Sequence, residues 1–197
     1  MYSGGHGFFN WLRTDPRFAK QQGCSYFLLE NKLWQLFGLD SAYGSPDRKG
    51  NIGNIYGGQI AWMAQERARA PEKKCVLLTH HQPFSAFDEV NAALEDQLRP
   101  LARRNQISAW FWGHEHYCAV YDCHNNIPYP ILLGHGGFPE RRKPLRAGAP
   151  SLDFDWNFVD AGEFVIFGFA VLDFNADQIA VRLIDVNGDP RYHFVIN

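Results

Sequence analysis

Three short apolar segments of this chain each run directly into histidine, and this pattern constrains the fold more than any other feature. The segments and their histidines are Cys75 to Thr79 before His80 and His81, Ala109 to Gly113 before His114, and Ile131 to Gly134 before His135. Continuous apolar runs of this length are typical of strands buried on both faces of a sheet. In open α/β sheets, ligand sites lie just beyond the carboxyl ends of the strands. We therefore expect these histidines to gather at one edge of a sheet.

The rest of the chain supplies the elements of a mixed α/β domain. The patterns predict a hairpin over 26–31 and 33–40, helices over 58–70 and 88–104, strands near 117–123 and 129–134, and three strands after residue 162. Segments 41–58 and 135–162 are rich in glycine and proline and predict long loops, and Pro100 should kink the second helix or end it early. These elements predict an α/β fold with more than one sheet, in a single domain spanning residues 1–197.

Composition excludes several classes of function. The formal net charge is -2, so the chain has no broad basic surface for nucleic acid or for an anionic membrane. It contains no apolar run of the roughly 18 residues that a spanning helix needs, and its start does not resemble an export signal. The four cysteines form no Cys-x-x-Cys pair, which is compatible with a reducing compartment. We therefore expect a soluble, cytoplasmic protein.

The pair His114-x-His116 is the feature that points to a metal. Alternate residues of a strand face the same side, so a continued strand would direct both imidazoles at one ion or at two neighbouring ions. Neutral imidazole binds zinc, iron, manganese and copper, and the spacing does not choose among them. We expect a divalent metal site that includes His80 from the neighbouring strand end.

The motifs around these histidines resemble those of the calcineurin-like metallophosphoesterases. Gly113 to His116 (GHEH) is similar to the Gly-His-x-His motif of that family, and Leu77 to Asp88 (LLTHHQPFSAFD) is similar to the strand-end histidine motif that precedes it. The stretches ILLGHGG and FGFAVLDF follow in the family's order. The resemblance covers the chain from about Tyr26 onward.

The resemblance implies an α/β/β/α sandwich with a two-metal centre. It implies that His80, with His81 as second choice, is one ligand and that His114 and His116 are directed one toward each metal. His80, His81 and His114 are the catalytic residues that it suggests. In such a centre two cations share a hydroxide, which attacks the phosphorus of a phosphate-ester substrate.

The chain departs from the family in its first half. The family has an Asp-x-His, a Gly-Asp and a Gly-Asn-His-Asp/Glu motif before the Gly-His-x-His motif, and none of these is present. We therefore expect an N-terminally incomplete domain that carries only the histidine-rich half of the site. Its sheet should lack N-terminal strands and keep an unpaired edge through which copies self-associate.

Three alternatives stay open. The chain is a degenerate, non-catalytic binding module of the same fold, or it holds a structural zinc through Cys118, Cys123 and His124. The residues Arg141, Arg142, Lys143 and Arg146 either meet substrate phosphate or form a solvated basic loop.

Overall fold

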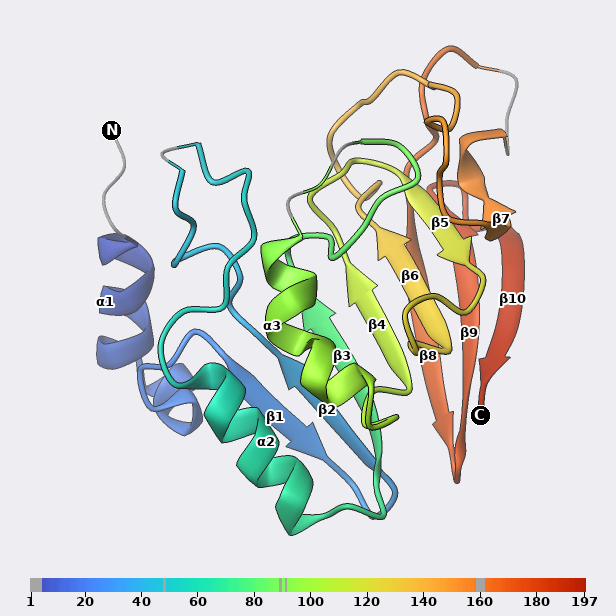
Figure 1. Ribbon diagram of the computed structural model, residues 1–197. Coiled ribbons are helices and arrows are strands. Elements are labelled where there is room, and N and C mark those ends of the chain that lie inside the picture. Colours follow the sequence, from blue (N-terminus) through green and yellow to red (C-terminus); the bar gives the residue numbers. More distant parts are fainter. Residues whose placement is uncertain (1–4, 48, 89, 91, 159–161) are drawn as a thin grey trace.

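A seven-stranded sheet forms the centre of the computed structural model, which describes residues 5–47, 49–88, 90, 92–158 and 162–197 (Figure 1). The strand order is β1-β2-β3-β4-β6-β5-β7. The strands are β1 (Phe27–Glu30), β2 (Trp34–Gly38), β3 (Lys74–Thr79), β4 (Ala109–Trp112), β5 (Cys118–Tyr121), β6 (Tyr129–Leu133) and β7 (Leu152–Asp155). The four strands β2, β3, β4 and β6 run parallel, whereas β1, β5 and β7 pair antiparallel with their neighbours. The predicted hairpin is confirmed as β1 and β2.

Two helices cover one face of this sheet, α2 (Gln59–Arg69) and α3 (Ala93–Ala102). The ring centroids of Trp62 on α2 and Phe37 on β2 lie 5.5 Å apart, so α2 covers the face of the sheet from which Phe37 projects. The helix expected over 88–104 is shorter than the pattern suggests, and residues 89 and 91 lie outside the described part of the chain. Pro100 lies in the last turn of α3, and the helix ends two residues later.

A second, three-stranded sheet lies on the opposite face of the central sheet. It consists of β8 (Gly168–Asn175), β9 (Gln178–Asp185) and β10 (Pro190–Ile196), in the order β10-β9-β8. Phe174 on β8 contacts Trp34 on β2 with ring centroids 5.9 Å apart, and Tyr192 on β10 stacks on Phe154 of β7 at 4.3 Å. The two sheets therefore enclose an apolar layer. This arrangement confirms a mixed α/β fold built on a mostly parallel central sheet.

Some elements were not foreseen. The loop expected over 135–162 contains β7, a four-residue strand at the edge beside β5, followed by the 3-10 helix η2 (Trp156–Phe158). A strand this short pairs because β5 offers it free backbone groups, and local sequence does not report that partner. Near the N-terminus, α1 (His6–Thr14) and the 3-10 helix η1 (Pro16–Gln21) form where only a short amphipathic stretch is evident.

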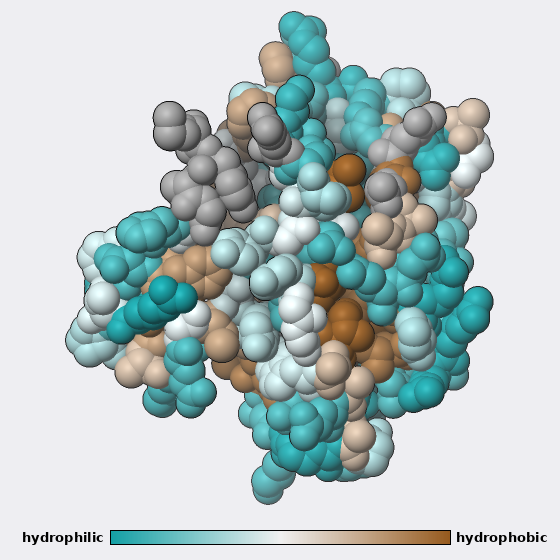
Figure 2. All heavy atoms as spheres, turned by 60° about the vertical axis from the view of Figure 1, so that its left-hand side comes forward, coloured by the Kyte–Doolittle hydropathy of each residue, from teal (hydrophilic) through white to brown (hydrophobic). Residues whose placement is uncertain are grey.

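The surface agrees with the composition. Hydrophilic residues cover most of the face shown in Figure 2, and hydrophobic residues reach the surface in patches near its middle. None of the helices in the described ranges combines the length and the apolar character that crossing a bilayer requires. In the described residues the outer strands are β1 and β7 in the central sheet and β8 and β10 in the small sheet. Self-association through an edge left unpaired by missing N-terminal strands stays a prediction.

Candidate metal centre

The carboxyl ends of three neighbouring parallel strands meet at the site. Ser41 lies shortly after β2, His80 directly follows β3, and His114 follows β4 after one glycine. The register pairs Thr79 with Trp112, and the backbone N–H of Gly113 donates to the carbonyl of His80 at 3.0 Å. Because parallel strands present their carboxyl ends at the same edge, side chains distant in sequence lie close together there.

The imidazoles of His80 and His114 face each other. Nδ1 of His114 lies 3.0 Å from Nε2 of His80. The backbone of His114 has φ 66°, in the left-handed region, which costs a non-glycine residue about 1–2 kcal/mol. This conformation turns the chain after β4, and strain of this kind gathers at functional sites.

His81 joins this pair but is already hydrogen-bonded at both ring nitrogens. The nitrogen atoms offered by His80, His81 and His114 all lie within 4.8 Å of one another, and this is the one such group of three in the described residues. Nε2 of His81 donates to the carbonyl of Gly50 at 2.7 Å, because a carbonyl only accepts. Nδ1 therefore accepts from the Ser41 hydroxyl at 3.0 Å. His81 is 1% exposed, so both of its ring nitrogens make their hydrogen bonds inside the protein.

Burial and crowding favour the neutral form of His80 and His114, which is the form that binds metals. Burial, followed by the neighbouring His81, His80 and His116, lowers the pKa of His114 to about 4. Burial, followed by His81 and His116, also lowers the pKa of His80. Imidazole must be neutral to donate its lone pair to a metal. His114 is neutral across the physiological range, and a lowered pKa favours the neutral form of His80 too.

The donor set of this group fits a divalent cation. Nε2 of His80 and Nδ1 of His114 contact each other, so a cation between them replaces this one contact. Two imidazole nitrogens on one tetrahedral zinc lie about 3.3 Å apart, given Zn–N bonds of about 2.0–2.1 Å. The separation of 3.0 Å is close to that span. The pair therefore fits one cation with a small adjustment.

His116, which was predicted as a ligand together with His80 and His114, lies outside this group. Its ring packs against Phe138 with centroids 4.6 Å apart, and its Nδ1 is 3.9 Å from a carboxylate oxygen of Glu140. The chain leaves strand geometry at His114, so the two histidines of the motif do not alternate as they do along a strand. His135, two residues after β6, is fully buried beside Trp156, and among the described residues its ring nitrogens have no hydrogen-bond partner.

A close backbone approach holds the loop that carries the GHEH motif. A methyl group at Gly134 would overlap the carbonyl oxygen of Glu115, whereas one at Gly137 would meet nothing within 4 Å. The N–H of Gly134 also donates to the carbonyl of Tyr117 at 2.8 Å. Gly134 is therefore required where the β6 end passes the motif, because only glycine leaves room for that carbonyl.

Glu115, between the two histidines of the motif, points into the protein. It is 5% exposed and accepts a hydrogen bond from the Ser85 hydroxyl. Burial, partly offset by the Ser85 hydrogen bond, raises the pKa of Glu115 to about 7. Ser85 in turn accepts from the backbone N–H groups of Phe87 and Asp88, at 2.8 and 2.9 Å. This network ties the loop after β3 to the loop after β4.

A polar cavity of about 370 Å³ opens beside the histidines. Its walls are formed by Asn51, Gln82, Asp88, His114, Glu115, His116, Tyr117, Glu140 and Lys143. Nζ of Lys143 donates to Asp88 at 2.8 Å. A ligand at the histidine cluster therefore has room to extend into a polar recess.

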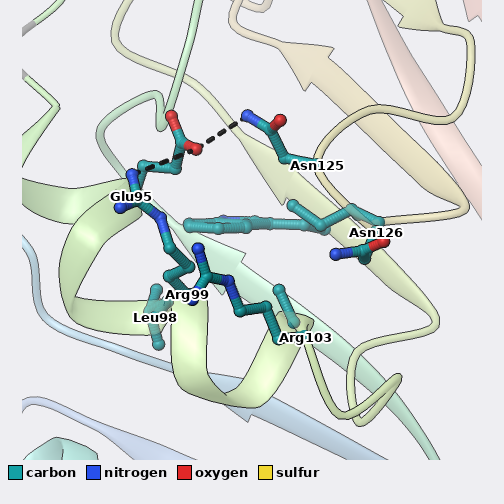
Figure 3. Close-up of a pocket in the computed structure, with 9 residues that line it drawn as sticks. Glu95, Leu98, Arg99, Arg103, Asn125 and Asn126 are labelled. Carbon is teal, nitrogen blue, oxygen red and sulfur yellow. Dashed lines mark hydrogen bonds and ion pairs between the residues drawn. The ribbon is translucent and has the colours of Figure 1, made fainter.

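A different cavity, of about 290 Å³, lies along α3 and the turn between β5 and β6 (Figure 3). Arg99 is held by Glu95 and Asp96, and Asn125 donates to Glu95 at 2.7 Å. Arg99 and Arg103 lie at the end of α3, where positive side chains stabilise the helix dipole. No histidine of the cluster lines this cavity, so it is separate from the site.

The remaining sequence candidates have ordinary structural roles in the described part of the chain. Cys118 is buried and Cys123 is exposed, and neither belongs to a group of three possible metal ligands there. In the basic loop, Arg141 pairs with Glu163, and Arg146 donates to the carbonyl of Ser85 at 2.9 Å. Lys143 is the member of that loop that reaches the cavity beside the histidines.

Sequence reasoning missed the residues that support the site. Ser41 and the Gly50 carbonyl lie outside every motif, whereas Gln82 and Gly134 lie within quoted motifs but were given no role there. Ser41 follows the same rule as the histidines, since it comes two residues after an apolar stretch that ends at Leu39. Ser41 could have been found by considering every polar residue that closely follows an apolar, strand-like stretch.

The fold and the cluster define an α/β protein with a candidate metal site at the carboxyl edge of its sheet. The chain belongs to the calcineurin-like phosphoesterase family, whose model matches residues 6–118. It is 26% identical over 133 residues to human (Homo sapiens) tartrate-resistant acid phosphatase type 5, covering 66% of this chain and 39% of that protein. It is 24% identical over 144 residues to the same phosphatase of Sus scrofa, covering 73% of this chain and 41% of that protein.

A solved structure supports the fold. The structure of "GAP50 the anchor in the inner membrane complex of Plasmodium" matches with a TM-score of 0.61 at 14% identity, covering 87% of this chain and 53% of that one. At this identity the match speaks for the fold alone. The chain spans about 40% of the length of the phosphatases to which it is similar, 39% and 41% in the two cases.

Proposed function

We propose that this chain carries the histidine-bearing part of the active site of a metal-dependent phosphoester hydrolase. The observation that carries the proposal is the separation of 3.0 Å between His80 Nε2 and His114 Nδ1 at two neighbouring strand ends. Membership of the phosphoesterase family and similarity to acid phosphatases support phosphate esters as substrates.

Each residue of the cluster has a distinct role in this proposal. His80 and His114 hold the cation, and the Ser41 and Gly50 contacts keep His81 in place behind them. A divalent cation supplies a Lewis acid for a phosphoryl oxygen and lowers the pKa of a water molecule. Manganese, iron and zinc all accept imidazole ligands. A second cation would have to recruit His116, whose ring packs on Phe138 in this structure.

Hydrolysis of a chromogenic ester tests the proposal. With Mn²⁺, Fe²⁺ or Zn²⁺ added, we expect turnover of p-nitrophenyl phosphate or bis(p-nitrophenyl) phosphate, and its loss in His80→Ala and His114→Ala. His193→Ala, which removes an exposed histidine on β10, serves as the matched control. Metal content per chain, measured on the loaded protein, distinguishes one cation from two. Absence of turnover by a folded, metal-loaded protein would contradict the proposal.

A second candidate function is a metal-binding module without catalysis. The group consists of three imidazoles, which are neutral donors and leave the full charge of a bound cation on the site. Two cations held together would repel each other strongly under these conditions. Stoichiometric metal binding that depends on His80 and His114, with no hydrolysis of either ester, would favour this candidate.

A further inference from the structure

A cavity of about 320 Å³ lies between α1 and the start of α2, apart from the histidine cluster (Figure 1). Its walls come from α1, from segment 23–26, from the turn after β2 and from the first residues of α2. None of His80, His81 and His114 lines it. Sites for small molecules have volumes of about 300–1,000 Å³, so this cavity has room for one ring system.

Three aromatic side chains, Phe9, Tyr43 and Tyr56, form a continuous row along this cavity, which we call the aromatic row. The ring centroids of Phe9 and Tyr43 lie 5.0 Å apart, and those of Tyr43 and Tyr56 lie 5.6 Å apart, both in edge-to-face geometry. Tyr43 is 40% exposed and Tyr56 is 58% exposed. Their free ring surface can therefore contact a further ring, in the stacked or edge-to-face arrangements that aromatic groups prefer.

Arg13 supplies the positive side chain of the cavity. It is exposed on α1, and in the described ranges of the chain its guanidinium has no ion pair and no hydrogen bond. Its Cζ lies 5.8 Å from the centre of the Phe9 ring, and its Cγ would lie 3.3 Å from a methyl group added at Gly23. The guanidinium is thus packed beside the cavity while its N–H donors stay free for a ligand.

The neighbouring polar groups already have partners. The carboxylate of Asp40 accepts hydrogen bonds from the Ser25 hydroxyl and from the backbone N–H of Tyr43, the latter at 2.9 Å. The amide of Gln59 accepts from the Asp40 N–H at 2.9 Å and donates to the Asp40 carbonyl at 3.1 Å. The helix α2 begins beside the cavity without a side-chain cap, so the positive end of its dipole adds to the charge of Arg13. What the cavity lacks is an anionic acceptor.

We propose that this cavity binds a small aromatic anion, with its ring against the aromatic row and its acid group on Arg13. A guanidinium pairs with a carboxylate or a phosphate through charge-assisted hydrogen bonds. A neutral aromatic ligand leaves Arg13 unpaired, and an aliphatic acid loses the contacts between rings. The site is separate from the candidate metal centre and does not depend on the hydrolysis proposed for it.

Three probes of similar size measure both requirements by calorimetry on the metal-free protein. Phenylacetate has the ring and the charge, phenylacetamide lacks the charge, and cyclohexylacetate lacks the aromatic ring. We expect phenylacetate to bind with a Kd below about 1 mM. The other two should bind about five- to tenfold more weakly. Phenylphosphonate carries a phosphate-like acid group, and the tighter of the two aromatic acids identifies which acid group the site takes.

Variants locate the binding in this cavity. Arg13→Gln should weaken phenylacetate about tenfold and leave phenylacetamide unchanged, because only the acid pairs with the guanidinium. Tyr56→Leu should weaken phenylacetate about three- to tenfold and leave cyclohexylacetate nearly unchanged. Both side chains are exposed, so both variants should fold. Arg104→Gln and Phe164→Leu, at exposed positions outside the cavity, are the matched controls and should keep the wild-type affinity.

The outcomes separate the two parts of the site. Equal affinities for phenylacetate and cyclohexylacetate would overturn the role of the aromatic row, and equal affinities for phenylacetate and phenylacetamide would overturn that of Arg13. If neither aromatic acid binds the wild-type protein, or if binding survives both Arg13→Gln and Tyr56→Leu, the proposal is wrong. A failure of ester hydrolysis does not affect these results, because the probes are not esters and no metal is added.

Discussion

Nδ1 of His114 lies 3.0 Å from Nε2 of His80, although the two residues are 34 positions apart in the sequence. The contact exists because β3 and β4 are parallel neighbours, with Thr79 paired to Trp112, so that the residues following the two strands leave the sheet side by side. Burial and the neighbouring imidazoles lower the pKa of His114 to about 4, and the same causes also lower the pKa of His80. Imidazole nitrogens this close could hold a cation between them, and the following predictions test the residues that support them.

His81 should hold the neighbouring imidazoles in place and should not itself be a main ligand of the cation. His81→Phe removes its hydrogen bonds to Ser41 and Gly50, and we expect the free energy of unfolding to fall by about 2–3 kcal/mol. The affinity for Zn²⁺, measured by competition with a chromogenic chelator, should fall less than in His114→Ala. If a folded His81→Phe protein loses as much affinity as His114→Ala, His81 is itself a ligand.

Ser41 should raise the affinity for the cation indirectly, because it holds His81 in place. Its hydroxyl is fully buried, donates to His81 Nδ1 at 3.0 Å and accepts from the His81 backbone N–H at 3.1 Å. Ser41→Ala should lower the free energy of unfolding by about 1–2 kcal/mol and metal affinity by about tenfold, as for other groups behind a ligand. Ser45→Ala, in the following loop, is the comparison. Equal metal affinities in the two variants would contradict this role.

Gly134 should not tolerate a side chain. A methyl group there overlaps the Glu115 carbonyl, so Gly134→Ala has to displace the GHEH loop. We expect a loss of about 3 kcal/mol or more in unfolding free energy, measured by urea denaturation, together with lost metal binding. Gly137→Ala is the matched control, since its methyl group meets nothing within 4 Å, and it should be neutral or slightly stabilising. If Gly134→Ala is as stable as Gly137→Ala, the GHEH loop moves aside at little cost, and the prediction is wrong.

His135 should make the fold sensitive to acid. Burial lowers the pKa of His135 to about 4, from an ordinary value of 6.5 in the unfolded chain. Below pH 6.5 the unfolded state takes up a proton that the folded state refuses, so stability falls as the pH drops toward 4. The loss between pH 7 and pH 5 is about 2 kcal/mol.

Urea denaturation of the wild-type protein and of His135→Phe at both pH values isolates this contribution. The variant should lose about 2 kcal/mol less than the wild type on acidification, because phenylalanine fills the space beside Trp156 without a titrating group. Identical pH dependence in the two proteins would mean that His135 is not kept neutral by burial.

Sequence patterns predicted much of the fold because the signals are local. The apolar runs before His80 and Gly113 form β3 and β4, and the segment 58–70, predicted as a helix, contains α2. The strand β7 was missed because four residues pair only where β5 already offers an edge. A short strand next to glycine and proline carries no periodicity long enough to recognise.

The sequence by itself determined that histidines follow buried strands, since the apolar runs and the histidines after them can be identified from the order of residues. It did not determine which imidazoles meet. The tertiary structure joined His80 to His114 and His81, and it directed His116 toward Phe138. The reason is that His114 adopts a left-handed backbone, which ends the alternation of a strand, while Ser41 and Gly50 fix His81 from segments that precede it. Side-chain direction after a strand depends on these distant contacts, and spacing along the chain does not encode them.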